Sequence, residues 1–289
     1  MHFVQAKSIL SASNGMNIYR GCSHGCVYCD ARSKCYQMDH AFEDIAVKEN
    51  APELLELELR KKRRRCMIGT GAMSDPYMHI EKELRYTRRF LELIEQYGFG
   101  ATVQTKSDMI LRDIDLIERI NNKTKFVVQM TLTTYDEGLC RILEPNVCTT
   151  RRRYEVLKEC QKRGIPTVVW ICPILPYIND TKENLDGLME YCRDAGVRGI
   201  INFGFGLTLR EGDREYYYEH LDKHFPGLKQ RYIREFGNNY ELPSPNAKEL
   251  WDSFKQKCKS YGIECDKDKV FQYLHEFEDK DAGEQMTLF

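Results

Sequence analysis

The chain has 289 residues, of which 42% are hydrophobic and 30% are charged, and its formal net charge is −1. This length allows one large α/β domain or two small ones with a sizeable core, and the near-neutral charge excludes a globally basic nucleic-acid binder. The longest apolar run, residues 167–178, contains two prolines and is too short to span a membrane. Because the first residues also lack the apolar region of a signal peptide, we expect a cytoplasmic protein without a membrane partner.

From residue 16 to about residue 205, short β-rich runs alternate with amphipathic stretches. The predicted strands are 16–21, 66–71, 100–106, 126–133, 166–174 and 199–205. The helices predicted between them are 51–65, 81–97, 110–121, 150–163 and 182–195. This alternation indicates parallel βαβ units and therefore an α/β fold, and the continuous apolar strands indicate a sheet covered on both faces.

After residue 206 the strand signals fade. Residues 213–276 are predicted to be helical with Tyr, Phe and Trp on the apolar faces, and the acidic final stretch loses periodicity until its last residues. We therefore expect a core domain over residues 1–206, a helical extension packed on it over 207–276, and a flexible tail over 277–289.

Polar and Gly-rich features follow the predicted strands at their carboxyl ends. Cys22 follows the first strand, "GTGAMSDPY" (69–77) the second, Lys106 closes the third, Thr133 closes the fourth, and "CPILP" (172–176) follows the fifth. Since α/β sheets and barrels build their sites at the carboxyl ends of the strands, the sequence predicts a functional site there.

Three cysteines, Cys22, Cys26 and Cys29, lie within eight residues in a C-x3-C-x2-C spacing. In a reducing compartment such thiols favour a metal over a disulfide. Three thiolates can bind three irons of a cubane cluster and leave the fourth iron open, and neighbouring glycines allow the loop to wrap a bulky group. Two alternatives stay open: a zinc site completed by Cys35 or His24, and three buried structural cysteines.

The stretch "CSHGCVYC" resembles the cluster motif of the radical S-adenosylmethionine (radical SAM) enzymes, and the resemblance extends over about residues 14–206. It implies a partial (β/α)6 barrel, a [4Fe–4S] cluster, and S-adenosylmethionine bound to the unique iron. An electron donor such as flavodoxin or ferredoxin would reduce the cluster, and S-adenosylmethionine would then be cleaved to methionine and a 5′-deoxyadenosyl radical that abstracts a hydrogen atom from substrate.

Within that superfamily, "GAMSDPY", "QTKSDMIL", "MTLTTYD" with "EPN", and "WICPILP" resemble the spore photoproduct lyase group, which repairs a thymine lesion in DNA. The resemblance implies that Ser74 and Asp75 lie near the methionine end of S-adenosylmethionine and that Lys106 meets its carboxylate. It also implies that Thr133 reaches the polar groups of S-adenosylmethionine and that Tyr28 lies close to the radical.

The chain departs from that group at two positions. Ala72 stands where the group has a hydrogen-donating cysteine, and Asp30 stands where it has a second tyrosine. Cys140 and Cys148 are candidates for the missing thiol. The preferred hypothesis is that the protein is an enzyme that acts on DNA. The alternatives are a radical enzyme that acts on RNA, a peptide or a small metabolite, and a non-enzymatic iron–sulfur sensor.

Two further stretches suggest contacts with partners. "TTRRR" (149–153) opens a predicted helix with arginines, where cations fit the helix dipole poorly, so a phosphate contact is one interpretation. The last residues, "QMTLF", resemble the pentapeptide that binds the bacterial β sliding clamp. The expected contact residues are Gln285, Met286, Leu288 and Phe289. The alternative is a C-terminus that folds back on its own core.

Overall fold

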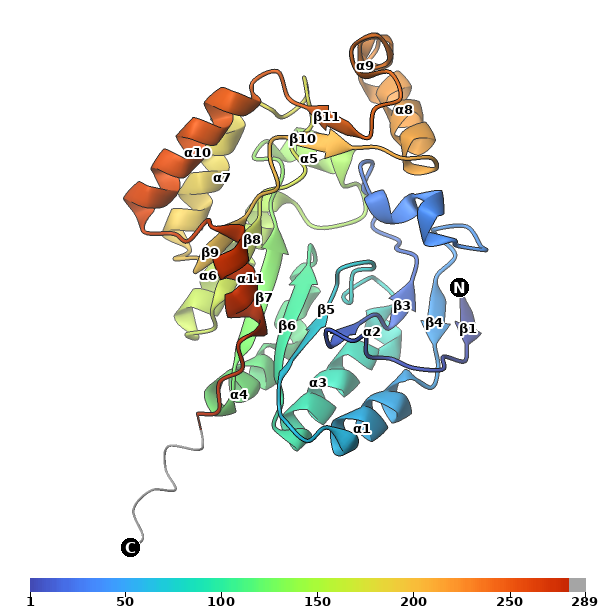
Figure 1. Ribbon diagram of the computed structural model, residues 1–289, viewed down its shortest axis with the longest axis vertical. Helices are drawn as coiled ribbons and strands as arrows, with labels where there is room; N and C mark the ends of the chain where they lie inside the picture. The colour runs from blue at the N-terminus through green and yellow to red at the C-terminus, as the bar shows by residue number, and fades with distance from the viewer. Residues whose placement is uncertain (281–289) are drawn as a thin grey trace, which may run out of the picture.

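A parallel sheet of six strands forms the centre of the computed structural model, which describes residues 1–280 (Figure 1). The strand order is β2-β5-β6-β7-β8-β9, so the strands of this sheet lie side by side in the order in which they occur along the chain. The strands are β2 Gly15–Met16, β5 Met67–Thr70, β6 Gly100–Thr105, β7 Phe126–Thr131, β8 Thr167–Trp170 and β9 Gly199–Ile201. The predicted α/β class and the parallel pairing are confirmed.

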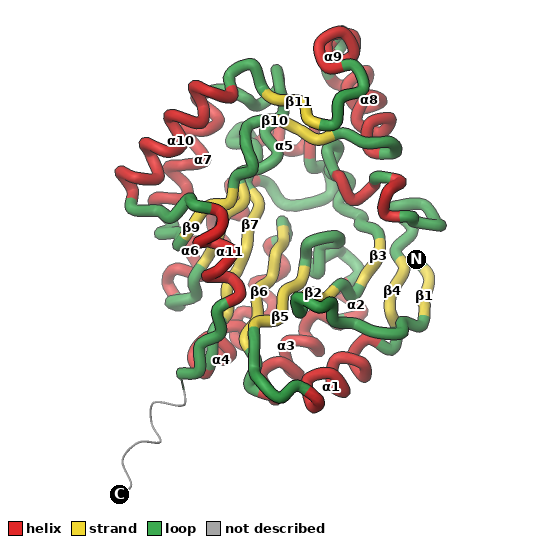
Figure 2. Tube along the Cα trace, in the orientation of Figure 1, coloured by secondary structure: helices red, strands yellow, loops and turns green. Residues whose placement is uncertain are grey.

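Helices in the crossover connections cover the sheet, as Figure 2 shows. They are α1 Ala51–Lys61, α2 Glu81–Leu84, α3 Tyr86–Tyr97, α4 Ile114–Lys123, α5 Glu137–Leu143, α6 Thr150–Lys162 and α7 Lys182–Asp194, with the 3-10 turn η3 Asp108–Asp113 before α4. Their apolar faces bury side chains such as Leu55, Ile94 and Leu157 against strand residues such as Val103 and Val128. This core lies between the strands and the helices and leaves the carboxyl ends of the strands free to build a site.

Three local features differ from the sequence prediction. The expected strand over 16–21 is divided: β2 joins the large sheet, whereas β3 Tyr19–Arg20 joins a separate sheet of order β1-β4-β3 with β1 His2–Val4 and β4 Ala46–Lys48. The helix expected to reach residue 65 ends at Lys61, because Lys62 is extended. The helix expected over 81–97 is interrupted at Arg85, whose φ of 53° is left-handed.

The C-terminal part contains strands that the sequence did not indicate. β10 Gly206–Thr208 pairs antiparallel with β11 Glu241–Pro243, so the domain boundary expected at residue 206 falls inside β10. Helices α8 Asp213–His224 and α9 Leu228–Phe236 lie between these strands, and Figure 1 shows all four elements beyond the strand ends of the large sheet. α10 Ala247–Tyr261 packs on α7, and α11 Lys267–His275 packs beside β9.

The described chain ends with residues that are bound to the body. Glu278 pairs with Lys125, Asp279 pairs with Arg65, and the Lys280 N–H donates to the Lys123 carbonyl over 3.0 Å. The tail boundary expected at residue 277 therefore does not mark the end of the packed chain. The expected clamp-binding residues (Gln285, Met286, Leu288 and Phe289) lie outside the described residues. No helix within residues 1–280 is both long and apolar enough to cross a membrane.

Candidate functional site

A cavity of about 800 Å³ lies at the carboxyl ends of the parallel strands. Its walls come from the cysteine loop, the loop after β5, the ends of β6 and β8, the residues after β9, and the β10–β11 pair. Cys22, Cys26 and Cys29 all line it. The structure thus brings the three thiols together with segments that are far apart in the sequence.

Close backbone contacts hold the cysteine loop in place. The Cys22 N–H donates to the Phe42 carbonyl over 3.1 Å, and a Cβ on Gly21 (φ +91°) would lie 2.5 Å from that carbonyl oxygen. At Gly25 (φ +68°) a Cβ would lie 3.0 Å from the Asn146 side chain, which itself donates to the Ser23 carbonyl. The "EPN" segment therefore braces the loop, and both glycines are required where the sequence predicted them.

Burial raises the pKa of each of the three thiols, and that of Cys22 reaches about 12. A metal or cluster that binds them as thiolates must therefore displace protons. The two residues considered as a fourth zinc ligand each have another partner, although His24 itself lines the cavity. His24 Nδ1 lies 3.4 Å from an Asp75 carboxylate oxygen, and exposed Cys35 accepts a hydrogen bond from Arg210. Within residues 1–280, no three His, Cys, Asp or Glu side chains are placed to hold a single metal ion.

The loop after β5 also lines the cavity, and Asp75 fastens it to β6. The Asp75 carboxylate accepts hydrogen bonds from the Tyr77 N–H (2.8 Å), the Thr105 hydroxyl (2.7 Å) and the Lys106 N–H (2.8 Å). The Ser74 hydroxyl donates to the Tyr19 carbonyl over 2.9 Å. Ser74 and Asp75 lie in the cavity wall, but their polar atoms are occupied by the protein.

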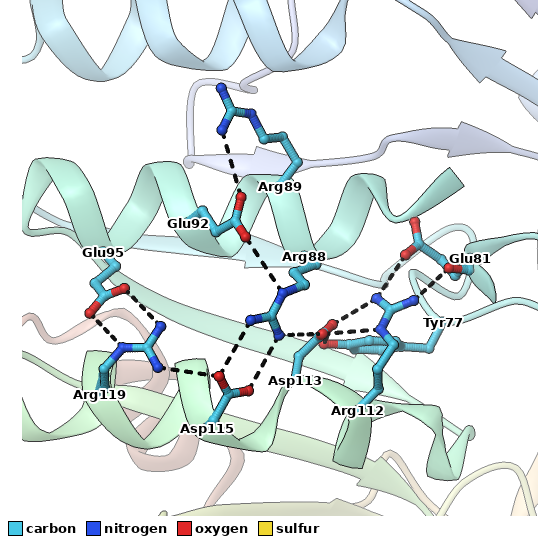
Figure 3. A network of polar contacts seen from close by, with 10 residues as sticks. All are labelled: Tyr77, Glu81, Arg88, Arg89, Glu92, Glu95, Arg112, Asp113, Asp115 and Arg119. Carbon is cyan, nitrogen blue, oxygen red and sulfur yellow. Dashed lines mark hydrogen bonds and ion pairs between the residues drawn. The ribbon is translucent and has the colours of Figure 1, made fainter. Parts of the chain in front are cut away.

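A network of buried ion pairs supports this loop from behind (Figure 3). Tyr77 donates to Asp113, whose carboxylate pairs with both Arg88 (3.0 Å) and Arg112 (2.7 Å). Arg112 also pairs with Glu81 over 3.0 Å, and the side chains of Asp113 and Glu81 are fully buried. Because removing one partner would leave an unpaired buried charge, this network fixes the position of the loop.

Lys106 is a cation in the cavity wall whose ammonium group has no hydrogen-bond or ion-pair partner in the part of the chain that the structure describes. Its Nζ lies 5.8 Å from the centre of the Tyr28 ring. Burial is the largest single influence on the pKa of Lys106 and acts to lower it, but Cys26, Glu144 and Cys29 together outweigh it, and the pKa is raised. The ammonium therefore stays charged and is available to an anionic ligand.

Tyr28 lines the cavity, and its hydroxyl donates to Glu144 in a buried group that the sequence reasoning missed. Arg153 pairs with Glu144 over 2.5 Å, and both side chains are fully buried. Burial acts to raise the pKa of Glu144, but Arg153 and Lys106 outweigh it, and the pKa is lowered. Arg153 is thus an internal counter-ion, which corrects its interpretation as part of a phosphate contact. The sequence did contain a sign of this buried group: Glu144 is the first residue of "EPN", a segment that matched the family but was given no role.

Thr133 does not line the cavity. It is fully buried, its hydroxyl lies 3.4 Å from Glu144, and its carbonyl accepts hydrogen bonds from Asn179 and Asn184. β7 ends at Thr131, and Thr131 is the threonine of this strand that lines the cavity.

The two cysteines considered as hydrogen donors, Cys140 and Cys148, direct their thiols away from the cavity. The Cys140 thiol contacts Glu144 and Thr150, and the Cys148 thiol donates to the Lys106 carbonyl. Neither is part of the cavity wall, whereas Cys172, at the end of β8, is. The sequence could have singled out Cys172 by its position near the carboxyl end of the fifth predicted strand, where it opens the "CPILP" segment.

Comparisons with known proteins agree with this arrangement. The model of the radical SAM superfamily matches residues 16–192. The chain is 30% identical over 241 residues to an uncharacterized protein of Mycobacterium bovis, with 81% of this chain and 70% of that protein covered. It is 30% identical over 181 residues to an uncharacterized protein of Methanocaldococcus jannaschii, with 62% of this chain and 67% of that protein covered.

Solved structures share the fold at low sequence identity. A mutant spore photoproduct lyase with bound AdoMet and dinucleoside spore photoproduct superposes with a TM-score of 0.63 at 14% identity, and the match covers 90% of this chain and 78% of that chain. A radical S-adenosylmethionine methyltransferase from Kitasatospora setae gives 0.55 at 13% identity, over 86% of this chain and 50% of that chain. The chain belongs to the radical SAM superfamily, whose cofactors are a [4Fe–4S] cluster and S-adenosylmethionine.

Proposed function

We propose that this radical SAM enzyme repairs or modifies a nucleobase lesion in DNA. The observation that carries the proposal is one cavity, at the strand ends, walled by three cluster-type thiols and an unpartnered lysine and large enough for a further ligand. The fold shared with spore photoproduct lyase, which was solved with a dinucleoside photoproduct, supports a nucleobase as the substrate. A base in duplex DNA would have to leave the stack to enter such a cavity.

Cys22, Cys26 and Cys29 are the proposed cluster ligands, and the residues present fit that group. The thiols line a shared cavity of about 800 Å³, and the two alternative ligands already have partners: His24 lies beside Asp75, and Cys35 accepts from Arg210. When bound, the cluster and S-adenosylmethionine supply one-electron chemistry that yields a radical able to abstract hydrogen. The protein's part is to hold the two cofactors and to exclude water.

Lys106 is the proposed partner of the S-adenosylmethionine carboxylate, because its ammonium is charged and partly buried in the cavity wall. Ser74 and Asp75 act by shaping the wall: Asp75 aligns Thr105 and the backbone of Lys106 with the loop after β5. The hydroxyl proposed to face the cofactor from β7 is that of Thr131, in place of Thr133.

Tyr28 is the proposed radical relay. Its ring borders the cavity while its hydroxyl donates to Glu144, so the phenol is held in one orientation beside a buried carboxylate. A Tyr28→Phe enzyme should still form 5′-deoxyadenosine but should release less product for each S-adenosylmethionine cleaved. An unchanged ratio of product to 5′-deoxyadenosine would remove Tyr28 from this role.

Cleavage of S-adenosylmethionine is tested by anaerobic reconstitution of the protein with iron and sulfide, followed by reduction with dithionite in the presence of S-adenosylmethionine. 5′-Deoxyadenosine should form, and Cys26→Ala should lose both iron and this product. A Cys265→Ala control, far along the chain in a partly buried position, should retain both. Iron binding without 5′-deoxyadenosine would indicate a sensor instead.

Whether damaged DNA is the substrate is tested by mass spectrometry. UV-irradiated and untreated DNA are analysed after incubation with the reduced enzyme and S-adenosylmethionine deuterated at C5′. A change confined to irradiated DNA supports lesion repair. The absence of any change in either DNA, from an enzyme that does form 5′-deoxyadenosine, would favour RNA, a peptide or a metabolite as substrate.

Recruitment to the β sliding clamp through Gln285, Met286, Leu288 and Phe289 is a separate proposal, supported by the sequence "QMTLF" alone. A Leu288→Ala, Phe289→Ala double variant should lose clamp binding in a pull-down or calorimetric titration. A Thr287→Ala variant, at the position between the expected anchors, should bind normally. Equal binding by all three proteins would remove the clamp from the proposed function.

A further inference from the structure

The mouth of the cavity carries two aromatic side chains that are open to solvent. Phe203 is 62% exposed and Tyr240 is 43% exposed, and both line the cavity. Phe203 follows β9, whereas Tyr240 precedes β11, so they reach the same cavity from two different parts of the fold. Exposed aromatic surface of this kind at a cavity mouth is typical of a binding site.

Phe203 is held by other aromatic rings. Its ring centre lies 5.8 Å from that of Trp170 and 6.2 Å from that of Phe271. The Trp170 indole N–H donates to Gln129 over 2.8 Å, and the Gln129 amide donates to Thr102 over 2.7 Å. A hydrogen-bonded chain that crosses three neighbouring strands therefore fixes the ring against which Phe203 packs.

Tyr240 is held by Arg210. The Arg210 guanidinium donates to the Tyr240 hydroxyl over 2.8 Å and lies 4.6 Å from the centre of the ring. Arg210 is in turn 3.7 Å from Asp30, the residue directly after the cysteine loop. Each of the two exposed rings thus has one supported side and an open side, and neither needs to be ordered when a ligand binds.

Resting on the proposed function, we propose that Phe203 and Tyr240 are stacking positions for the bases of an unpaired nucleic-acid strand, with Phe203 stacking the base that enters the cavity. Stacking on fixed aromatic rings suits bases because every base has a π face. Because the cavity of about 800 Å³ must also hold the cofactors, it has room for a single extruded base at most and excludes a duplex.

The test is fluorescence anisotropy of a fluorescein-labelled ten-residue oligothymidylate with the anaerobically reconstituted enzyme. Phe203→Ala should weaken binding roughly 5- to 150-fold, the range found when a stacking aromatic residue is truncated. Phe203→Leu should lose as much affinity as Phe203→Ala does. Leucine keeps the apolar area but lacks the π face on which a base stacks. Phe203→Trp should restore it.

Phe3→Ala is the matched control, because Phe3 is 50% exposed in β1 and is not part of the cavity wall. This variant should bind the oligonucleotide as the wild-type enzyme does. Thermal unfolding of every variant checks the fold, and Tyr240→Ala tests the second position in the same way.

Two results would overturn the inference while leaving the proposed function standing. One is oligonucleotide binding by Phe203→Leu that equals that of the wild type, since the contact would then be merely apolar. The other is a loss of S-adenosylmethionine affinity in Phe203→Ala as large as the loss of oligonucleotide affinity, since the ring would then serve the cofactor. A third result, failure of the wild-type enzyme to bind the oligonucleotide at all, would also overturn the inference, and the test on irradiated DNA would then decide the proposed function separately.

Discussion

Arg153 illustrates how one buried cation organises the site. It pairs with Glu144 and also donates to the carbonyls of Thr131 and Cys148, so it connects the end of β7 to the segment that braces the cysteine loop. Its neighbours Arg151 and Arg152 are exposed. Three adjacent arginines therefore have different roles, which depend on the side of α6 that each one occupies.

Arg153→Ala is expected to lower the free energy of unfolding by about 3–5 kcal/mol, because it leaves Glu144 as an uncompensated buried charge. Arg152→Ala is the control: its pairs with Asp108 and Glu155 are solvent-exposed and contribute at most about 1 kcal/mol. Urea denaturation of the two variants measures the difference. Equal losses would show that burial of the Glu144 pair has no energetic consequence.

Asp213, at the start of α8, is expected to make stability depend on pH. It is 1% exposed, and burial raises its pKa to about 6, with Asp30 adding to the shift. Between about pH 4 and pH 6 the folded protein therefore binds more protons than the unfolded chain, so this group's contribution to stability falls as pH rises. Asp213→Asn should remove about 1–2 kcal/mol of that dependence in thermal unfolding between pH 4 and pH 7. A slope identical to wild type would contradict the raised pKa.

At the level of the elements, the connection between β5 and the loop after it depends on a single glycine. Gly71 has a φ of +103°, and a Cβ there would lie 2.0 Å from the Gln104 carbonyl oxygen in β6. The close approach lets the loop pass over the end of the neighbouring strand and carry Ser74 and Asp75 into the cavity wall.

Gly71→Ala is expected to cost about 2–5 kcal/mol, because backbone strain and a steric clash with a strand add together. It should also abolish S-adenosylmethionine binding, since the loop must move. Gly164→Ala is a control with positive φ (+65°) but no atom within 4 Å of the added Cβ, and it should cost about 1 kcal/mol and bind normally. Isothermal titration and urea denaturation of both variants test this; normal binding by Gly71→Ala would contradict it.

In the molecule as a whole, the cavity joins parts of the chain that are distant in sequence. Its walls include residues near positions 22–31, 71–75, 104–106, 170–173 and 203–208, together with 240–243. The C-terminal part also contacts the segment that follows the cysteine loop, through the pair of Lys34 with Glu211 and the packing of Arg32 on the Tyr216 ring. Ligands in the cavity therefore bind the native state but not the unfolded chain.

S-Adenosylmethionine is therefore expected to stabilise the iron-loaded protein by about 2.7 kcal/mol at a hundred times its dissociation constant, measured as a rise in Tm under anaerobic conditions. Lys106→Met should lose most of this rise, because the carboxylate of the ligand loses its cation. Lys182→Met, which removes an exposed lysine paired with Asp186 at the start of α7, should retain it. The same rise in Lys106→Met would exclude Lys106 from the cofactor site.

Local sequence was sufficient to predict the parallel sheet, the covering helices, the cysteine loop and the glycines within it. These depend on hydrophobic periodicity, on turn chemistry and on the spacing of thiols along a short loop, all of which are properties of neighbouring residues. Lys106 also stood out at the end of a predicted strand, but its expected role came from the family resemblance.

The β10–β11 pair, the position of Thr133 behind Glu144, the buried role of Arg153 and the meeting of Phe203 with Tyr240 required the folded chain. Each depends on a contact between residues that are far apart in sequence or on the direction in which a short segment turns, and a strand of three residues carries too little periodicity to be recognised. Burial then assigns different roles to side chains of the same type, because the free energy of a charge depends on its surroundings as well as on its identity.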